Sequence, residues 1–124
     1  MRLHHVQVAI PAGGEEIARR FYVEGLGLFE VEKPALLQAR GGLWVRSPDG
    51  AEIHLGVEEP FRPARKAHPA LLLEDVVSLD GTAERLTELG FEVDHTERDT
   101  FPGYLRLHTF DGHGNRVELV APPE

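Results

Sequence analysis

The sequence predicts an α+β fold made of two copies of one module. Two turns rich in Asp and Gly, each followed by a strand-like run, occur half a chain apart at Ser47–Val57 and Phe110–Val120. Three pairs of landmarks recur at an offset of 63 or 64 residues: His5 and His68, Gly27 and Gly90, and His54 and Glu118. A shared offset over separate landmarks is typical of a duplicated unit.

The first module, about residues 1–58, is predicted to contain a strand, a helix and about three further strands. Leu3–Ile10 alternates apolar and polar residues, as a half-buried strand does. Glu15–Val23 has apolar residues at helical spacing and acidic residues in its first turn, and Gly25 and Gly27 end it. Short extended runs separated by Pro and Gly follow: Leu28–Glu32, Leu36–Arg40, Leu43–Arg46 and Glu52–Val57.

The second module, about residues 68–124, repeats this order after a linker at residues 59–67. Two prolines exclude a central strand or a regular helix from the linker. Apolar residues at helical spacing follow the potential caps Ser78 and Asp80, and Gly90 ends this helix. The predicted strands are His68–Val76, Phe91–Thr96, Tyr104–Phe110 and Arg116–Ala121. We therefore expect the two modules to form a single domain.

The composition argues against several classes of protein. The chain of 124 residues is long enough for a self-supporting core, and it contains no cysteine for disulfides or a thiolate metal site. A formal net charge of −8 argues against a nucleic-acid partner. No apolar run reaches the roughly 20 residues of a membrane span, and the first residues enter a strand pattern directly. A cytoplasmic protein without a membrane partner is expected.

Four polar side chains are candidate metal ligands: His5, His54, His68 and Glu118. Because side chains alternate along a strand, these four point away from the apolar face that packs on the helices. Each lies in the first or last strand of its module, so a curved sheet can bring all four into one cleft. Three imidazoles and one carboxylate suit one divalent ion of zinc, nickel, iron, cobalt or manganese. Any one of them alone is more often a structural residue, and only the repeat favours the joint site.

Five further residues are candidates for binding a small substrate: Arg65, Lys66, Arg106, His108 and Trp44. Arg65 and Lys66 belong to the one basic cluster, which is either a solvated linker or a positive rim beside His68 that attracts a small anion. Arg106 and His108 share one face of the penultimate strand. Trp44, on the matching strand of the first module, is either an apolar wall of the cleft or a core residue.

Together these segments resemble the vicinal oxygen chelate superfamily, which includes glyoxalase I, methylmalonyl-CoA epimerase, extradiol dioxygenases and bleomycin-resistance proteins. The resemblance rests on Leu-His-His-Val-Gln-Val-Ala-Ile at the start, Arg-Phe-Tyr-Val-Glu-Gly-Leu-Gly-Leu after the first helix, Ala-His-Pro-Ala-Leu opening the second half, and Asp-Gly-His-Gly-Asn-Arg-Val-Glu-Leu-Val at the end. It implies two βαβββ modules that form a cup-shaped mixed sheet around one divalent metal ion, usually in a homodimer.

The resemblance implies particular roles for the candidate residues. It places metal ligands on His5, His68 and Glu118, a set that also matches the two histidines and one carboxylate of the extradiol dioxygenases. His54 falls where glyoxalase I has a carboxylate and the epimerase a glutamine, and a histidine there can ligate or act as a base. Ala9 stands where bacterial glyoxalase I has an arginine that holds glutathione, which argues against glutathione as a cosubstrate.

Three functions are consistent with this sequence. The leading hypothesis is a metal-dependent lyase or isomerase of glyoxalase type, which binds two neighbouring oxygens of a small molecule and stabilises an enediolate or another oxyanion. In that hypothesis His54 and Glu118 are the catalytic residues. The alternatives are an iron(II) extradiol-type dioxygenase and a non-catalytic protein that sequesters its ligand, as bleomycin-resistance proteins do.

Overall fold

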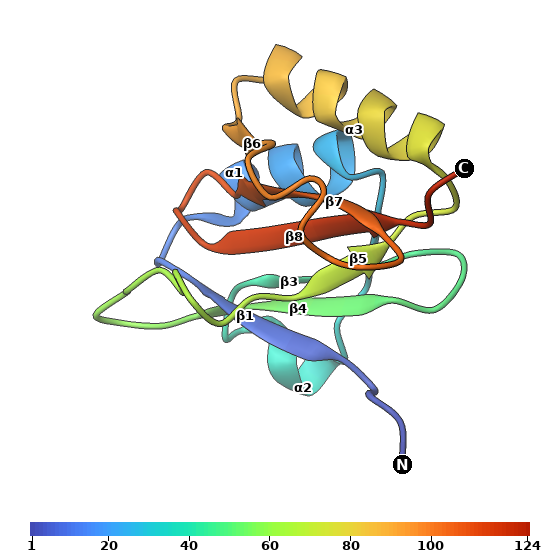
Figure 1. Ribbon diagram of the computed structural model, residues 1–124. Coiled ribbons are helices and arrows are strands. Elements are labelled where there is room, and N and C mark those ends of the chain that lie inside the picture. The colour runs from blue at the N-terminus through green and yellow to red at the C-terminus, as the bar shows by residue number, and fades with distance from the viewer.

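The computed structural model describes residues 1–124 and contains two four-stranded mixed sheets (Figure 1). The first sheet has the order β1-β4-β3-β2, with β1 at Val6–Ile10, β2 at Phe29–Val31, β3 at Leu43–Arg46 and β4 at Glu52–Val57. The second has the order β5-β8-β7-β6, with β5 at Ala70–Leu72, β6 at Val93–Asp94, β7 at Leu105–Phe110 and β8 at Arg116–Ala121. In both sheets the first strand of the module lies parallel to the last. The matching orders confirm the two predicted βαβββ modules.

The helices lie against the apolar faces of the sheets. In the first module α1 (Glu15–Ala18) continues into a π-helical segment, η1 (Arg19–Gly25), and in the second α3 (Val76–Glu88) follows β5. Figure 1 shows α3 and the α1–η1 segment on the same side of the second sheet. Both sheets and these helices contribute to one apolar core, whose largest fully buried residues include Phe21, Tyr22, Leu55, Leu86, Leu107 and Leu119. Because the apolar faces are used in this way, His54, His108 and Glu118 project from the opposite faces of their strands. None of the helices has the length and apolar character that a membrane span requires.

Two local predictions about helices were wrong. Leu36–Arg40 was expected to be extended, but Ala35–Gln38 forms a short helix, α2, which begins after Pro34. Ala, Leu and Gln favour helix over strand, and the run has no β-branched residue. In the second module the N-cap of α3 is Asp75, whose side chain accepts a hydrogen bond from the Ser78 N–H at 2.8 Å. The residues predicted as caps therefore lie inside the helix.

A buried polar network connects the two modules. Asp111, in the β7–β8 turn, accepts hydrogen bonds from the Tyr22 hydroxyl at 2.8 Å and from Asn115 Nδ2 at 3.0 Å. Asn115 Nδ2 also donates to the Ala9 carbonyl at 2.8 Å, and Asn115 Oδ1 accepts from the Ala64 N–H at 2.8 Å. Burial, together with the Asp111 carboxylate, raises the pKa of Tyr22 well above its ordinary value, so the hydroxyl keeps its proton and donates. This network fixes β1, η1 and the linker to the hairpin that carries the candidate site.

Candidate functional site

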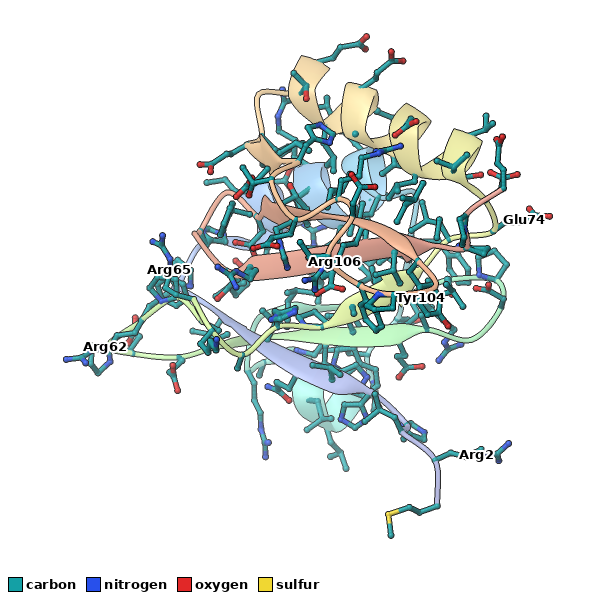
Figure 2. The ribbon with its side chains drawn as sticks, in the orientation of Figure 1. Arg2, Arg62, Arg65, Glu74, Tyr104 and Arg106 are labelled. Carbon is teal, nitrogen blue, oxygen red and sulfur yellow. The ribbon has the colours of Figure 1, made fainter.

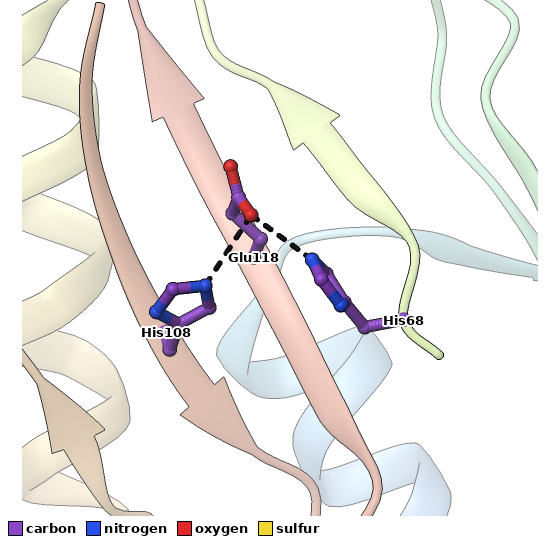
Figure 3. Close-up of side chains that lie close together, drawn as sticks. All are labelled: His68, His108 and Glu118. Carbon is purple, nitrogen blue, oxygen red and sulfur yellow. Dashed lines mark hydrogen bonds and ion pairs between the residues drawn. The ribbon is translucent and has the colours of Figure 1, made fainter. Parts of the chain in front are cut away.

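Three potential ligand side chains meet on the outer face of the second sheet: His68, His108 and Glu118 (Figure 3). One nitrogen or carboxylate oxygen of each lies within 4.8 Å of the other two. His68 lies just before β5, whereas His108 on β7 is paired directly with Glu118 on β8. His68 Nε2 lies 3.0 Å and His108 Nε2 3.3 Å from Glu118 Oε1. Two imidazoles and a carboxylate on neighbouring strands are a donor set that suits a divalent ion.

The hydrogen bonds of His68 support this interpretation. His68 Nδ1 lies 2.8 Å from the carbonyl oxygen of Lys66. Because a carbonyl can only accept, the proton of a neutral His68 ring must be on Nδ1, and the lone pair of Nε2 then faces the Glu118 carboxylate. Two acceptors at 3.0 Å require a proton or a cation between them. Histidines that bind a metal ion through one ring nitrogen usually donate the N–H of the other ring nitrogen to an acceptor such as a backbone carbonyl. The residues present therefore fit a metal ion.

Glu118 is held in its ionised form by its neighbours. Burial alone would raise its pKa, but the charge of Arg106, together with the contacts of His68 and His108 when these rings are protonated, outweighs burial and lowers the pKa below its ordinary value. Arg106 Nη1 lies 3.4 Å from Glu118 Oε1. Arg106 also donates from Nη2 to Thr100 Oγ1 at 2.7 Å, which fixes its position near the middle of the second sheet in Figure 2. A buried ionised carboxylate, 4 % exposed, is thus ready to bind a cation.

On the first sheet, His54 lies in a stack of aromatic rings. The indole of Trp44 stacks on the His54 imidazole at 3.8 Å between ring centroids, and the imidazole of His5 stacks on its other side at 3.9 Å. Trp44 and His54 are directly paired on β3 and β4, which brings the two rings together. The stack leaves His54 only 6 % exposed. Trp44 is therefore a wall beside a candidate ligand and lies outside the core cluster.

Glu52 orients His54 within this stack. His54 Nε2 lies 2.7 Å from Glu52 Oε2, and Glu52 Oε1 accepts from Arg46 Nε at 2.8 Å. A carboxylate only accepts when ionised, and the hydrogen bond from His54 followed by that from Arg46 lowers the pKa of Glu52. The neutral His54 ring therefore carries its proton on Nε2 and its lone pair on Nδ1. Burial lowers the pKa of His54 although Glu52 opposes this change, so the ring is neutral near pH 7 and can ligate or accept a proton.

A cavity of about 290 Å³ adjoins His54, with Trp44 and Leu37 of α2 in its lining. Gln7 on β1 lies across Gly56 of β4 in this lining, and a Cβ at Gly56 would come within 2.0 Å of Gln7 Nε2. A side chain at residue 56 would therefore displace the Gln7 amide from this position. The short helix α2 covers this part of the outer face, so the residues that were predicted as a strand instead close a small cavity next to the ring stack.

The four predicted metal ligands thus fall into two pairs. His68 and Glu118 lie together on the second sheet, and His5 and His54 lie together on the first. Within one chain the one group of three potential ligands within 4.8 Å is that of the second sheet, and its third member is His108. Of the residues predicted to bind substrate, Arg65 places its guanidinium over the Phe110 ring, 5.7 Å from the ring centroid. The backbone carbonyl of Lys66 accepts the hydrogen bond from His68 Nδ1.

Two residues near the candidate ligands were missed or assigned differently from sequence. Glu52 was not singled out, although it precedes His54 by two residues and must share its face of β4. His108 was predicted to bind substrate, and the structure places it among the potential ligands. The turn Asp111–Gly114 pairs Phe110 with Arg116, and counting outward from that pair sets His108 opposite Glu118. The sequence thus contained both signals: the two-residue spacing of Glu52 and His54, and the pairing that the turn imposes on the last two strands.

Comparisons with known proteins agree with this architecture. The sequence model of the Glyoxalase/Bleomycin resistance protein/Dioxygenase superfamily matches residues 2–119. A crystal structure of a glyoxalase family protein from Bacillus anthracis is 39 % identical, with a TM-score of 0.87 over 98 % of this chain and 95 % of that one. No match was found among curated protein sequences.

Two more distant structures share the fold. The antibiotic binding protein TnmS3 from Streptomyces sp. CB03234 is 27 % identical, with a TM-score of 0.70 over 98 % of both chains. The fosfomycin resistance protein FosX from Listeria monocytogenes is 16 % identical, with a TM-score of 0.72 over 98 % of this chain and 90 % of that one. The fold is thus that of a two-module α+β protein, and this chain carries a candidate metal site on its second sheet. The chain belongs to the Glyoxalase/Bleomycin resistance protein/Dioxygenase superfamily.

The contact between Glu52 and His54 gives a first testable prediction. In Glu52→Gln the pKa of His54 is expected to fall further, because the charge and hydrogen bond of Glu52 raise it in the native protein. The His54 ring resonances, followed by NMR from pH 4 to pH 8, measure this change. Glu30→Gln removes the same charge from β2, which is separated from β4 by β3, and is the matched control. A higher His54 pKa in Glu52→Gln, or an equal change in both variants, would contradict the assigned contact.

Proposed function

We propose that this chain is a metal-dependent enzyme of glyoxalase-like type that acts on a small molecule bound through two neighbouring oxygens. His68 and Glu118 would hold the ion, together with His5 and His54 of a second copy of the chain in a homodimer. The bound ion would act as a Lewis acid on the two oxygens of the substrate. The observation that carries the proposal is the meeting of His68 and His108 at the buried Glu118, with His68 Nε2 3.0 Å from Glu118 Oε1 while His68 Nδ1 faces the Lys66 carbonyl.

The shared site is supported by the position of the two pairs of candidate ligands. They lie on the outer faces of separate sheets, and the first strand of each module, β1 or β5, is an edge strand with one side unpaired by any other strand. An edge strand presents free backbone groups to another chain. In a symmetric dimer the first sheet of each copy would face the second sheet of the other copy. The dimer would therefore contain two equivalent sites.

In this site His54 would be the base or the fourth ligand. Its Nδ1 is the ring nitrogen that is left open by Glu52, and its lowered pKa keeps the ring neutral near pH 7. Trp44 would form a flat apolar wall behind it. Arg106 would hold the ionised Glu118, and His108 would either complete the coordination or donate a proton to the developing oxyanion.

A complementation experiment tests both the metal and the shared site. His5→Ala/His54→Ala removes the ligands of the first sheet, and His68→Ala/Glu118→Gln removes those of the second. Each double variant alone is expected to bind no zinc above background. After equal amounts are unfolded together and refolded, half of the dimers are mixed and each carries one intact site, so about a quarter of the wild-type zinc content should return.

The outcomes of this mixing experiment separate the possibilities. Full zinc content in His5→Ala/His54→Ala would place the ion within one chain, on His68, His108 and Glu118. No recovery in the refolded mixture would overturn the shared site. Absence of zinc, nickel, iron, cobalt and manganese from the wild-type protein, after exposure to each, would overturn the metal-dependent function itself.

Two other functions are favoured by particular observations. The group of two histidines and one carboxylate within one chain is the donor set of iron(II) oxygenases, and oxygen consumption by iron-loaded protein on a panel of catechols would reveal an extradiol-type dioxygenase. The similarity to an antibiotic binding protein favours a ligand-sequestering role. Saturable binding of a ligand that is recovered unchanged after prolonged incubation would support that role over catalysis.

A further inference from the structure

Arg116 has no role in the site described so far, although it lies beside it. It is the first residue of β8 and is separated by one residue from Glu118, so both side chains project from the same face of the sheet. Arg116 Nε is buried and is the one buried side-chain nitrogen or oxygen of the chain with no hydrogen-bond partner. A buried polar group without a partner is rare in folded proteins and requires an explanation.

The lack of a partner is not caused by a shortage of acidic residues. The chain has 21 Asp and Glu against 13 Lys and Arg, yet none of its ion pairs includes Arg116. The linker residues Arg62, Arg65 and Lys66 also take part in no ion pair, and Figure 2 shows Arg62 and Arg65 at the same end of the molecule. An acidic protein thus has a small region of uncompensated positive charge next to its candidate metal ligands.

A cavity of about 430 Å³ lies between β1 and the start of β5, and its lining contains both Arg116 and His68. Gln7, Asn115 and Arg62 add polar groups to this lining, and Glu58 is its one acidic residue. The polar atoms of the Asn115 side chain are already used within the protein, since it bonds Ala9, Ala64 and Asp111. Arg116 and Arg62 are therefore the cationic groups of this cavity that no carboxylate pairs, and Arg116 is the one whose Nε is buried without a hydrogen-bond partner.

We propose that Arg116 binds an anionic group of the substrate, a carboxylate or a phosphate. This inference rests on the proposed function, because it assumes that the same substrate reaches His68 and Glu118 with its two neighbouring oxygens. The planar guanidinium donates two parallel N–H bonds to such an oxyanion. Residues two apart on a strand are separated by roughly 7 Å. The substrate class is thus a small molecule with vicinal oxygens at one end and an oxyanion several bonds away.

The test measures anion binding apart from metal binding. Inorganic phosphate and, separately, acetate are titrated into metal-free protein at constant ionic strength, while the arginine Nε–H resonances are followed by NMR. Arg116→Gln is compared with Arg2→Gln, which removes the same charge from the N-terminal residues. Arg116→Lys keeps the charge but loses Nε. Circular dichroism melting verifies that each variant is folded, and zinc binding is measured on the same samples.

The expected result is a shift of one buried Nε–H resonance in the wild type and phosphate or acetate binding that is at least about tenfold weaker in Arg116→Gln. Arg116→Lys should bind with intermediate affinity and Arg2→Gln like the wild type. The tighter of the two anions identifies the group. Equal affinities in Arg116→Gln and Arg2→Gln, or no resonance shift in the wild type, would overturn the inference. Anion binding at Arg116 without zinc binding in any form would overturn the proposed function and leave the anion site standing.

Discussion

Glu118→Gln is expected to reduce the affinity for zinc by more than about 100-fold. Loss of a group that merely orients a ligand costs up to about 100-fold in metal affinity, and loss of the charged ligand itself should cost more. The amide also places an NH₂ group, or a weaker uncharged acceptor, where His68, His108 and Arg106 all approach one carboxylate oxygen within 3.4 Å. Isothermal titration of metal-free protein with zinc measures the effect.

Glu88→Gln is the matched control for this prediction, because Glu88 is exposed near the end of α3 and the substitution changes the net charge equally. Zinc affinity should be unchanged in this control. If Glu118→Gln binds zinc as tightly as Glu88→Gln, Glu118 is not a metal ligand. Its lowered pKa would then reflect only its ion pairs with neighbouring side chains.

Asp111→Ala is expected to lower the free energy of unfolding by about 3–5 kcal/mol, since a buried group left without its partner costs about 1–3 kcal/mol and several are affected. The substitution removes the acceptor of the Tyr22 hydroxyl and of Asn115 Nδ2, and also that of the N–H groups of His113 and Asn115. Urea unfolding monitored by circular dichroism gives the value. The connection between the modules should weaken with it.

Tyr22→Phe measures how much stability is lost when only the hydrogen bond between Tyr22 and Asp111 is removed. The ring stays in the core and Asp111 Oδ2 keeps Asn115 as a partner, so the expected cost is about 1–2 kcal/mol. Asp111→Ala is expected to lower the free energy of unfolding by more than Tyr22→Phe does. An equal loss of stability in the two variants would mean that Asp111 contributes little beyond its bond to Tyr22.

The repeat and the faces of the strands could be predicted because they depend on local periodicity. β8 was predicted with the bounds that the structure gives, Arg116–Ala121, and its alternation placed Glu118 opposite the core. The same alternation placed His54 on the outer face of β4. The prediction of an extended run at Leu36–Arg40 was wrong because a short apolar run without strong periodicity is compatible with both helix and strand. The structure forms α2 there.

The sequence by itself determined that His54 and Glu118 face away from the core, because alternation along a strand needs only a few neighbouring residues. His5 and His68 were predicted within strands but lie just before β1 and β5. Which of these side chains meet was decided by the tertiary structure, since the distance between two strands depends on sheet order and on how the modules pack. Sheet order set His108 beside Glu118 and brought His68 to them, and it stacked His5 and Trp44 on His54. Each pair lies on the sheet of its own module, and the packing of the modules does not bring the two pairs into one ligand group, which is the physical basis for proposing a second copy of the chain.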